Sequence, residues 1–166
     1  MRTLLLLLCF VVAAPAAPRG KVAGGLERLL YVTDRIGLSV YDINDGHALL
    51  GRIDVPDTGN YKGIAASPAL GQLYLSSYRT DELVAMDLAT NRVVWRKKHG
   101  KYADSMFITP DGRTMYVPYR DEDWWGVVDA ATGDLRAKIH VGRGKNYDDH
   151  PIGSIGPHNT WINPAG

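Results

Sequence analysis

Three tyrosine-containing segments recur along this 166-residue chain at a nearly constant spacing. Tyr31, Tyr74 and Tyr116 are 43 and 42 residues apart, and each lies in a short run of apolar and β-branched residues. A period of about 40 to 45 residues is typical of proteins that stack one supersecondary unit on the next. The repeat therefore restricts the chain to a series of similar units, each of which buries its apolar faces against its neighbours.

Two other features recur with the tyrosines and define the repeating unit. After each tyrosine segment, a second apolar run ends in an aspartate followed by a polar turn, at Asp42, Asp87 and Asp129. Pro-Gly turns precede two of the tyrosines, as in Ile108-Thr109-Pro110-Asp111-Gly112. Short runs of β-branched and aromatic residues indicate strands when turn residues separate them every 8 to 12 positions, roughly. Four short antiparallel strands in each unit predict the blades of a β-propeller.

These elements resemble the YVTN-type β-propeller repeats, which belong with the WD40-like and quinoprotein amine dehydrogenase β-chain-like propellers. The matching segments are strands and turns of successive units: 31–34, 87–91, 109–112, 129–133 and 135–141. The resemblance implies an all-β fold with about three four-stranded antiparallel blades, present as an open arc of a ring of about seven blades. It is specific for the fold and does not identify a function.

The repeats also divide the chain. We expect a signal peptide at 1–16, a linker at 17–28 and a partial propeller at 29–166. Within the propeller, we expect blade one at about 29–55 without its inner strand, blade two at about 62–98, blade three at about 104–141 and the inner strand of a next blade at about 158–163. Because this last strand has no partner in the sequence, we expect a C-terminally truncated fragment that is marginally stable by itself.

The N-terminus carries the features of an export signal. An apolar run from Leu4 to Ala14 follows Arg2 and is too short to span a bilayer, which takes about 20 residues. Ala14-Pro15-Ala16 supplies the small residues of a cleavage site, so we expect cleavage after Ala16 and a periplasmic or extracellular protein without a membrane span. A retained membrane anchor is the alternative.

Cysteine content and charge exclude several classes of protein. The only cysteine, Cys9, lies in the signal segment, so the mature chain has no disulfide and no thiolate ligand. Loss of Arg2 leaves as many basic residues as the 18 acidic ones, and this balance gives no indication of nucleic-acid binding. We predict no cofactor, no metal ligand and no catalytic residue from a recognisable motif.

Basic and tyrosine residues recur in the loops that a propeller places on one face. The loops between the second and third strands carry Arg35, Arg79 and Arg120, and the loops before the inner strands carry Tyr61, Lys62, Lys101 and Tyr102. Guanidinium groups hold carboxylates, and tyrosines offer amphipathic contact area. This pattern predicts a rim that binds a small anionic or polar ligand or a protein partner. The alternative is a solvated rim whose charges offset one another.

Two segments depart from the repeat. The stretch 142–158 is longer than the equivalent loops, and such loops are often functional. It contains His150 and His158, which are candidate ligand-binding residues at the mouth of the ring. A metal site there is an open alternative, although the histidine spacing matches no metal motif. Trp124 and Trp125 are adjacent, so we expect one to pack between blades and the other to face away.

We therefore predict an exported, non-catalytic binding scaffold. An alternative is a propeller enzyme or enzyme subunit, with lactonase-like hydrolases and the propeller subunits of quinoprotein or copper oxidoreductases as the analogues that the resemblance implies. A third hypothesis is a cell-surface or adhesion array. Convergent histidine or acidic residues at the mouth of the ring favour the enzyme.

Overall fold

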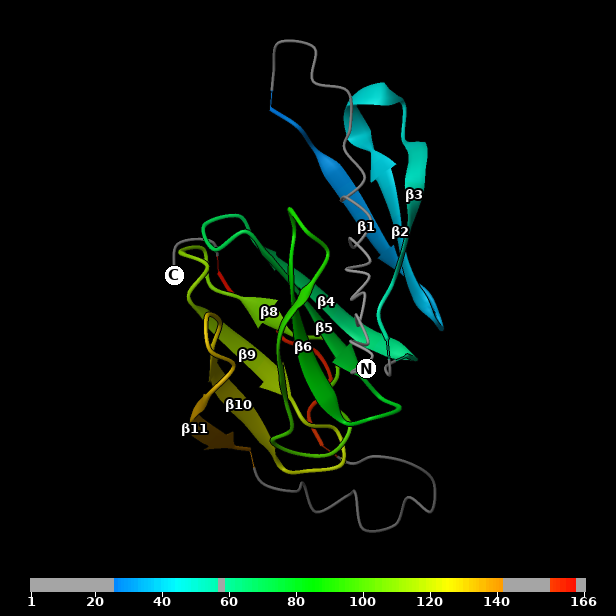
Figure 1. The fold of residues 1–166 in the computed structure, drawn as a ribbon. Coiled ribbons are helices and arrows are strands. Elements are labelled where there is room, and N and C mark those ends of the chain that lie inside the picture. Colours follow the sequence, from blue (N-terminus) through cyan, green and yellow to red (C-terminus); the bar gives the residue numbers. More distant parts are fainter. Residues whose placement is uncertain (1–25, 57–58, 142–155, 164–166) are drawn as a thin grey trace, which may run out of the picture.

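The computed structural model describes residues 26–56, 59–141 and 156–163 (Figure 1). Within these ranges the chain forms strands and one 3-10 helix, η1 (Ile43–Asp45), without an α-helix. The strands are β1 (Leu29–Thr33), β2 (Gly37–Asp42), β3 (Ala48–Asp54), β4 (Tyr61–Ser67), β5 (Gln72–Ser77), β6 (Glu82–Asp87), β7 (Val93–Lys97), β8 (Phe107–Ile108), β9 (Thr114–Pro118), β10 (Trp124–Asp129) and β11 (Leu135–His140). The predicted all-β fold is confirmed.

The expected signal peptide lies outside the described residues. In the ranges that the structure does describe, no helix is long and apolar enough to cross a membrane.

The strands form three separate antiparallel sheets, in which each strand pairs with the next one along the chain. Sheet one has the order β1-β2-β3, sheet two β4-β5-β6-β7 and sheet three β8-β9-β10-β11. The turn residues of each repeat explain this order, because short connections favour pairing between consecutive strands. Within the described residues β1 is an edge strand, so sheet one has three strands where the other two have four.

Two expected inner strands are shorter than the sequence predicts. Blade three was expected to begin at about 104, but its inner strand β8 pairs only at Phe107–Ile108. The Ser105 N–H donates instead to Asp104 Oδ1 at 2.8 Å, which removes it from the ladder. The expected strand 158–163 makes a single parallel bridge, between Asn159 and Ser105. Side-chain hydrogen bonding competes here with the regular strand.

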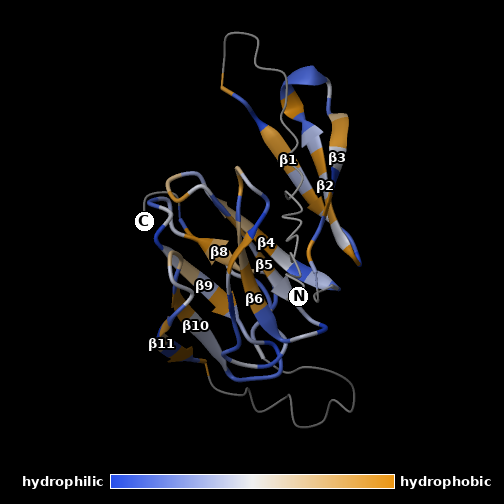
Figure 2. Ribbon diagram, viewed as in Figure 1, coloured by the Kyte–Doolittle hydropathy of each residue, from blue (hydrophilic) through white to orange (hydrophobic). Residues whose placement is uncertain are grey.

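Two apolar clusters fill the spaces between the sheets, and Figure 2 shows apolar residues on strands of all three sheets. Leu73 and Leu75 of β5 join the cluster shared with sheet one, whereas Tyr74 joins the cluster shared with sheet three. This alternation follows from the period of two in a strand. Sheet two is buried on both faces, which explains the continuous apolar runs in β5 and β6.

The repeated aspartates hold the turns that follow β2, β6 and β10. Asp87 Oδ1 accepts hydrogen bonds from the backbone N–H of Ala89 at 3.0 Å and of Thr90 at 2.7 Å. Asp129 Oδ1 likewise accepts from the Thr132 N–H at 2.9 Å. Each carboxylate thus satisfies turn donors that the sheet leaves unpaired, which explains why an aspartate recurs at this position.

These turns make the fold sensitive to acid. The hydrogen bond from the Thr90 hydroxyl, assisted by turn N–H groups, lowers the pKa of Asp87, and the Thr132 N–H does the same to the pKa of Asp129. An aspartate in the unfolded chain has a pKa of about 3.9. A lower pKa in the folded state stabilises the fold above about pH 4, and this contribution is lost as the pH falls through the folded-state value.

We therefore expect the urea midpoint to fall between about pH 6 and pH 2.5, and to fall less in Asp87→Asn than in the wild type. Far-ultraviolet circular dichroism follows the loss of β-structure as urea is added. Asp121→Asn, at an exposed position in the loop 119–123, controls for the loss of one charge. An Asp87→Asn variant whose midpoint falls as steeply as that of the wild type contradicts this assignment.

Candidate functional site

The loops on one side of the three sheets are joined by backbone hydrogen bonds into a rim. This rim comprises the loops 34–36, 78–81 and 119–123 and the described residues that precede β4 and β8. The Asn60 N–H donates to Arg35 O at 2.9 Å, and the Tyr78 N–H donates to Asn60 O at 3.2 Å. Asn60 therefore ties sheet one to sheet two.

The same hydrogen bonds show which rim positions are equivalent. The Arg120 N–H donates to Tyr102 O at 2.9 Å, as the Tyr78 N–H does to Asn60 O, so Tyr78 and Arg120 occupy matching positions. Arg79 lies one residue beyond the position that the sequence analysis gave it. Tyr78 was missed because it is the fourth residue after Tyr74, where the other repeats have arginine.

Arg35 and Arg79 nevertheless lie beside one cavity. Together with Ile36, Asn60 and Tyr78, they line an open cavity of about 350 Å³ between sheets one and two. Both arginines and Tyr78 are exposed, and 43% of Tyr78 is accessible to solvent. Asn60 adopts a left-handed φ of 53°, which asparagine tolerates better than most residues and which allows the sharp entry into β4.

A row of cations and tyrosines continues from this cavity toward sheet three. Lys62 Nζ lies 6.0 Å from the centre of the Tyr78 ring, and that ring lies 4.1 Å from the ring of Tyr102. Arg120 completes the row, with its Cζ 5.1 Å from the Tyr102 ring centre and its Nη1 donating to the Tyr102 hydroxyl at 3.2 Å. Cation–π contacts order long basic side chains that are otherwise mobile.

The remaining predicted residues are placed differently. Tyr61 is 8% exposed and belongs to the apolar cluster between sheets one and two, so it does not present a surface to a ligand. Because side chains alternate along β4, Tyr61 faces the core where its neighbour Lys62 faces outward. Lys101 is exposed, and its N–H donates to Glu122 Oε1 at 3.3 Å. His158 lies beside Asp104, and His150 falls outside the described residues.

Comparisons with known proteins show the fold but not a family. No family description and no curated protein matches the chain. Among solved structures, the chain is similar to hydrazine synthase of Kuenenia stuttgartiensis, with a TM-score of 0.59 and 17% identity over 74% of this chain and 40% of that one. It is also similar to the dihydro-heme d1 dehydrogenase NirN in complex with DHE, with a TM-score of 0.57 and 20% identity over 78% of this chain and 27% of that one.

A third similar structure is Hsv2 of Kluyveromyces lactis, with a TM-score of 0.53 and 14% identity over 68% of this chain and 33% of that one. The chain is an arc of β-propeller blades. Sheets one, two and three are its consecutive blades. The chain spans well under half the length of each of these structures, and at such low identity the likeness establishes the fold alone.

The two adjacent tryptophans have different surroundings in the propeller. Trp124 is 3% exposed and packs on Tyr119, with ring centres 4.3 Å apart. Trp125 is partly exposed, and its Nε1 donates to Thr160 Oγ1 at 3.0 Å. As expected, one ring packs between blades and the other faces away, toward the segment 156–163.

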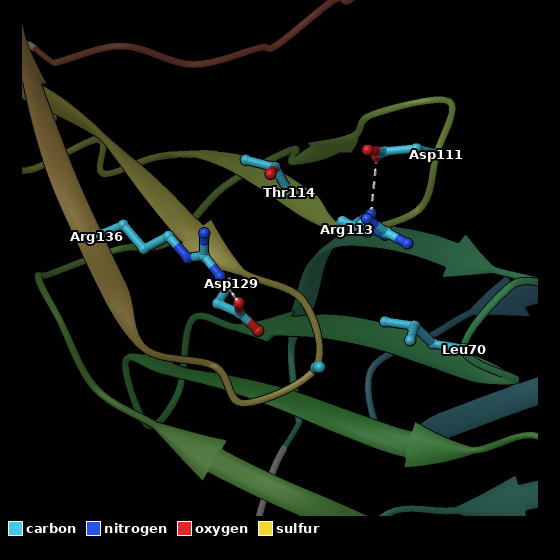
Figure 3. Close-up of a pocket in the computed structure, with 7 residues that line it drawn as sticks. Leu70, Asp111, Arg113, Thr114, Asp129 and Arg136 are labelled. Carbon is cyan, nitrogen blue, oxygen red and sulfur yellow. Dashed lines mark hydrogen bonds and ion pairs between the residues drawn. The ribbon is translucent and has the colours of Figure 1, made fainter.

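A second cavity, of about 380 Å³, lies among the turns at the other end of the propeller blades (Figure 3). Three of its charged groups are already engaged: Arg136 forms an ion pair with Asp129, and Asp111 Oδ1 accepts hydrogen bonds from the backbone N–H of Arg113 at 3.0 Å and from Thr109 Oγ1 at 2.6 Å. This cavity therefore fits a structural role better than ligand binding. Within the described part of the chain, no group of three or more histidine, cysteine or acidic side chains is placed to hold a metal ion.

Proposed function

We propose that this protein is an exported β-propeller of the YVTN-repeat type that binds a small anionic ligand through its rim. The observation that carries this proposal is the cavity lined by Arg35, Arg79, Asn60 and Tyr78, together with the adjoining row from Lys62 to Arg120. A binding site needs convergent polar groups at a concave surface, and this rim offers two guanidinium groups, an amide and an exposed aromatic ring.

The charge balance at the cavity supports a ligand more than a solvated surface. Arg52, Arg96 and Arg136 each form an ion pair with a carboxylate of the propeller. Among the described residues, neither the Arg35 nor the Arg79 guanidinium has such a partner. Two unpaired guanidinium groups beside one cavity attract a carboxylate or phosphate group, because each can donate two parallel hydrogen bonds.

Citrate, measured by isothermal titration calorimetry, is a suitable probe of the rim. We expect Arg35→Gln/Arg79→Gln to bind citrate at least about 100-fold more weakly than the wild type, because each lost hydrogen bond to a charged group contributes about 1.5 to 3 kcal/mol and the variant loses at least two. The matched control is Arg113→Gln/Arg136→Gln at the second cavity, which removes the same charge. Equal weakening in both double variants, or no citrate binding by the wild type, contradicts the proposal.

The alternative function is that of a propeller enzyme or enzyme subunit, such as a lactonase-like hydrolase or an oxidoreductase subunit. Two of the similar structures carry enzyme names, which is an analogy of fold. Export to the periplasm or beyond is part of the main proposal and rests on the N-terminal sequence. N-terminal sequencing of the protein purified from whole cells and medium tests it: a chain that begins at Ala17 supports export, and a chain that keeps Met1 and stays in the cytoplasmic fraction contradicts it.

A further inference from the structure

Three successive repeats place different polar residues at one equivalent position, in or just before the inner segment of the blade. Lys62, Asp104 and His158 each lie five residues before the residue that precedes a proline turn, which is Ser67, Thr109 or Asn163. Residues at one position in neighbouring inner strands face the same end of a propeller. This position therefore presents a lysine, a carboxylate and an imidazole in sequence around the mouth of the ring.

Contacts between the strands bring these positions close together. Ser105 Oγ lies 3.4 Å from Lys62 O, so sheets two and three approach closely at this point. Ser105 also pairs with Asn159, and the Thr160 N–H donates to Ser105 O at 3.2 Å. The segment 156–163 is thus held against sheet three, with its Gly156 N–H donating to Arg120 O at 2.8 Å. The mouth position adjoins the row from Lys62 to Arg120.

Asp104 is a buried carboxylate that faces His158. It is only 6% exposed, and its Oδ1 accepts hydrogen bonds from the Ser105 N–H at 2.8 Å and the Ser105 hydroxyl at 3.3 Å. Its Oδ2 lies 3.3 Å from His158 Nδ1. A carboxylate beside Nδ1 favours the tautomer with the proton on Nδ1 and leaves the Nε2 lone pair free to accept a proton.

The His158 side chain remains accessible, with 46% of its surface exposed, whereas Asp104 beneath it is anchored. An exposed imidazole oriented by a fixed carboxylate has the arrangement of a general base. The adjacent row of cations and tyrosines offers a place for an anionic substrate. We propose that His158, positioned by Asp104, is a catalytic general base that hydrolyses carboxylate-bearing esters held by the rim cations. The choice of an anionic substrate rests on the anion binding proposed above. The role of His158 as a base rests on its contact with Asp104 alone.

The reaction needs only water as a co-reactant. His158 Nε2 accepts a proton as the oxygen of a water molecule forms a bond to the ester carbonyl carbon. The bond from that carbon to the alcohol oxygen then breaks, and the protonated Nε2 returns its proton to the departing oxygen. The products are a carboxylic acid and an alcohol, and His158 regains its starting state.

The chain contains a natural control for this pair. His140 and Asp123 show the same separation of 3.3 Å between Nδ1 and a carboxylate oxygen. In that pair the aspartate side chain is 41% exposed, against 9% for the Asp104 side chain alone, and His140 lies at the end of the outer strand β11. If proximity of an aspartate were sufficient, both histidines would contribute equally to hydrolysis.

The test is the hydrolysis of mono-p-nitrophenyl succinate, an anionic ester, by the whole protein. We expect His158→Gln to lower kcat/KM about 100-fold, within the range of about 10² to 10⁴ for general acid–base catalysis, and His140→Gln to leave it unchanged. Asp104→Asn should lower kcat about 10-fold and leave KM unchanged, a split expected of a residue that positions the base and does not hold the substrate. Wild-type rates in His158→Gln, or an equal loss in His140→Gln, overturn the proposal.

Two further measurements keep the result decisive. If His158→Gln fails to fold, diethylpyrocarbonate labelling of the folded wild type serves instead: acylation mapped to His158 must abolish turnover, and full activity after that modification overturns the proposal. Comparison with neutral p-nitrophenyl acetate separates the two proposals. Dependence on His158 without preference for the anionic ester refutes only the anion site, whereas citrate binding without His158-dependent turnover refutes only the general base.

Discussion

Trp124→Ala is expected to lower the free energy of unfolding by about 3 to 5 kcal/mol, the range measured for removal of a buried large aromatic side chain. Trp124 is 3% exposed, and its ring lies between the Tyr119 ring and the Lys138 ammonium group, whose Nζ is 3.9 Å from the ring centre. Removing the ring opens a cavity in the cluster between sheets two and three, because the close-packed residues around it relax only in part.

Trp125→Ala is the matched control, because it removes the same side chain from the next position in β10. We expect a cost of about 1 kcal/mol, since Trp125 is partly exposed and loses mainly its hydrogen bond to Thr160. Urea unfolding followed by far-ultraviolet circular dichroism gives both values. Equal destabilisation by the two variants contradicts the assignment of Trp124 to the core between blades.

Gly63→Ala is expected to lower the free energy of unfolding by about 3 kcal/mol, at the upper end of the usual cost of overpacking. A Cβ atom at position 63 lies 2.6 Å from Asp104 O and 2.9 Å from Ser76 Oγ. The first neighbour is backbone of the next blade and has little room to move. The substitution therefore forces the inner strands of sheets two and three apart.

The same strand offers a control for Gly63. Ala66→Val adds more volume to β4 than Gly63→Ala, but at an exposed position. We expect its urea midpoint to stay within experimental error of the wild type, because surface substitutions usually change stability by less than about 0.5 kcal/mol. A Gly63→Ala variant as stable as Ala66→Val contradicts the close approach of the two inner strands.

Features that lie within one repeat could be predicted from the sequence. The strands around Tyr31, Tyr74 and Tyr116 and the turns held by Asp87 and Asp129 form where local sequence places them. In these segments alternation of apolar residues, turn chemistry and side-chain hydrogen bonding all favour one structure. The all-β blade arrangement follows, since each repeat predicts the same set of consecutive antiparallel strands.

Contacts between blades could not be predicted in the same way. The Tyr78 and Tyr102 rings meet although 24 residues separate them, and a single repeat contains no information on which rim residues become neighbours. The burial of Tyr61 was missed for a related reason, because the face that β4 turns to sheet one depends on the packing of two blades. The contact between Asp104 and His158 was missed because the two residues belong to different repeats, 54 positions apart.

The rim cavity spans two blades that share no strand pairing: Arg35 belongs to sheet one, and Tyr78 and Arg79 belong to sheet two. An anion held by both guanidinium groups is therefore also a crosslink between two separately hydrogen-bonded sheets. Binding of the anion therefore raises the free energy of unfolding, because any ligand that binds only the folded state stabilises it. Reciprocally, a change in the angle between these blades alters the spacing of the two guanidinium groups. The affinity of the rim for an anion therefore depends on how the two blades pack together.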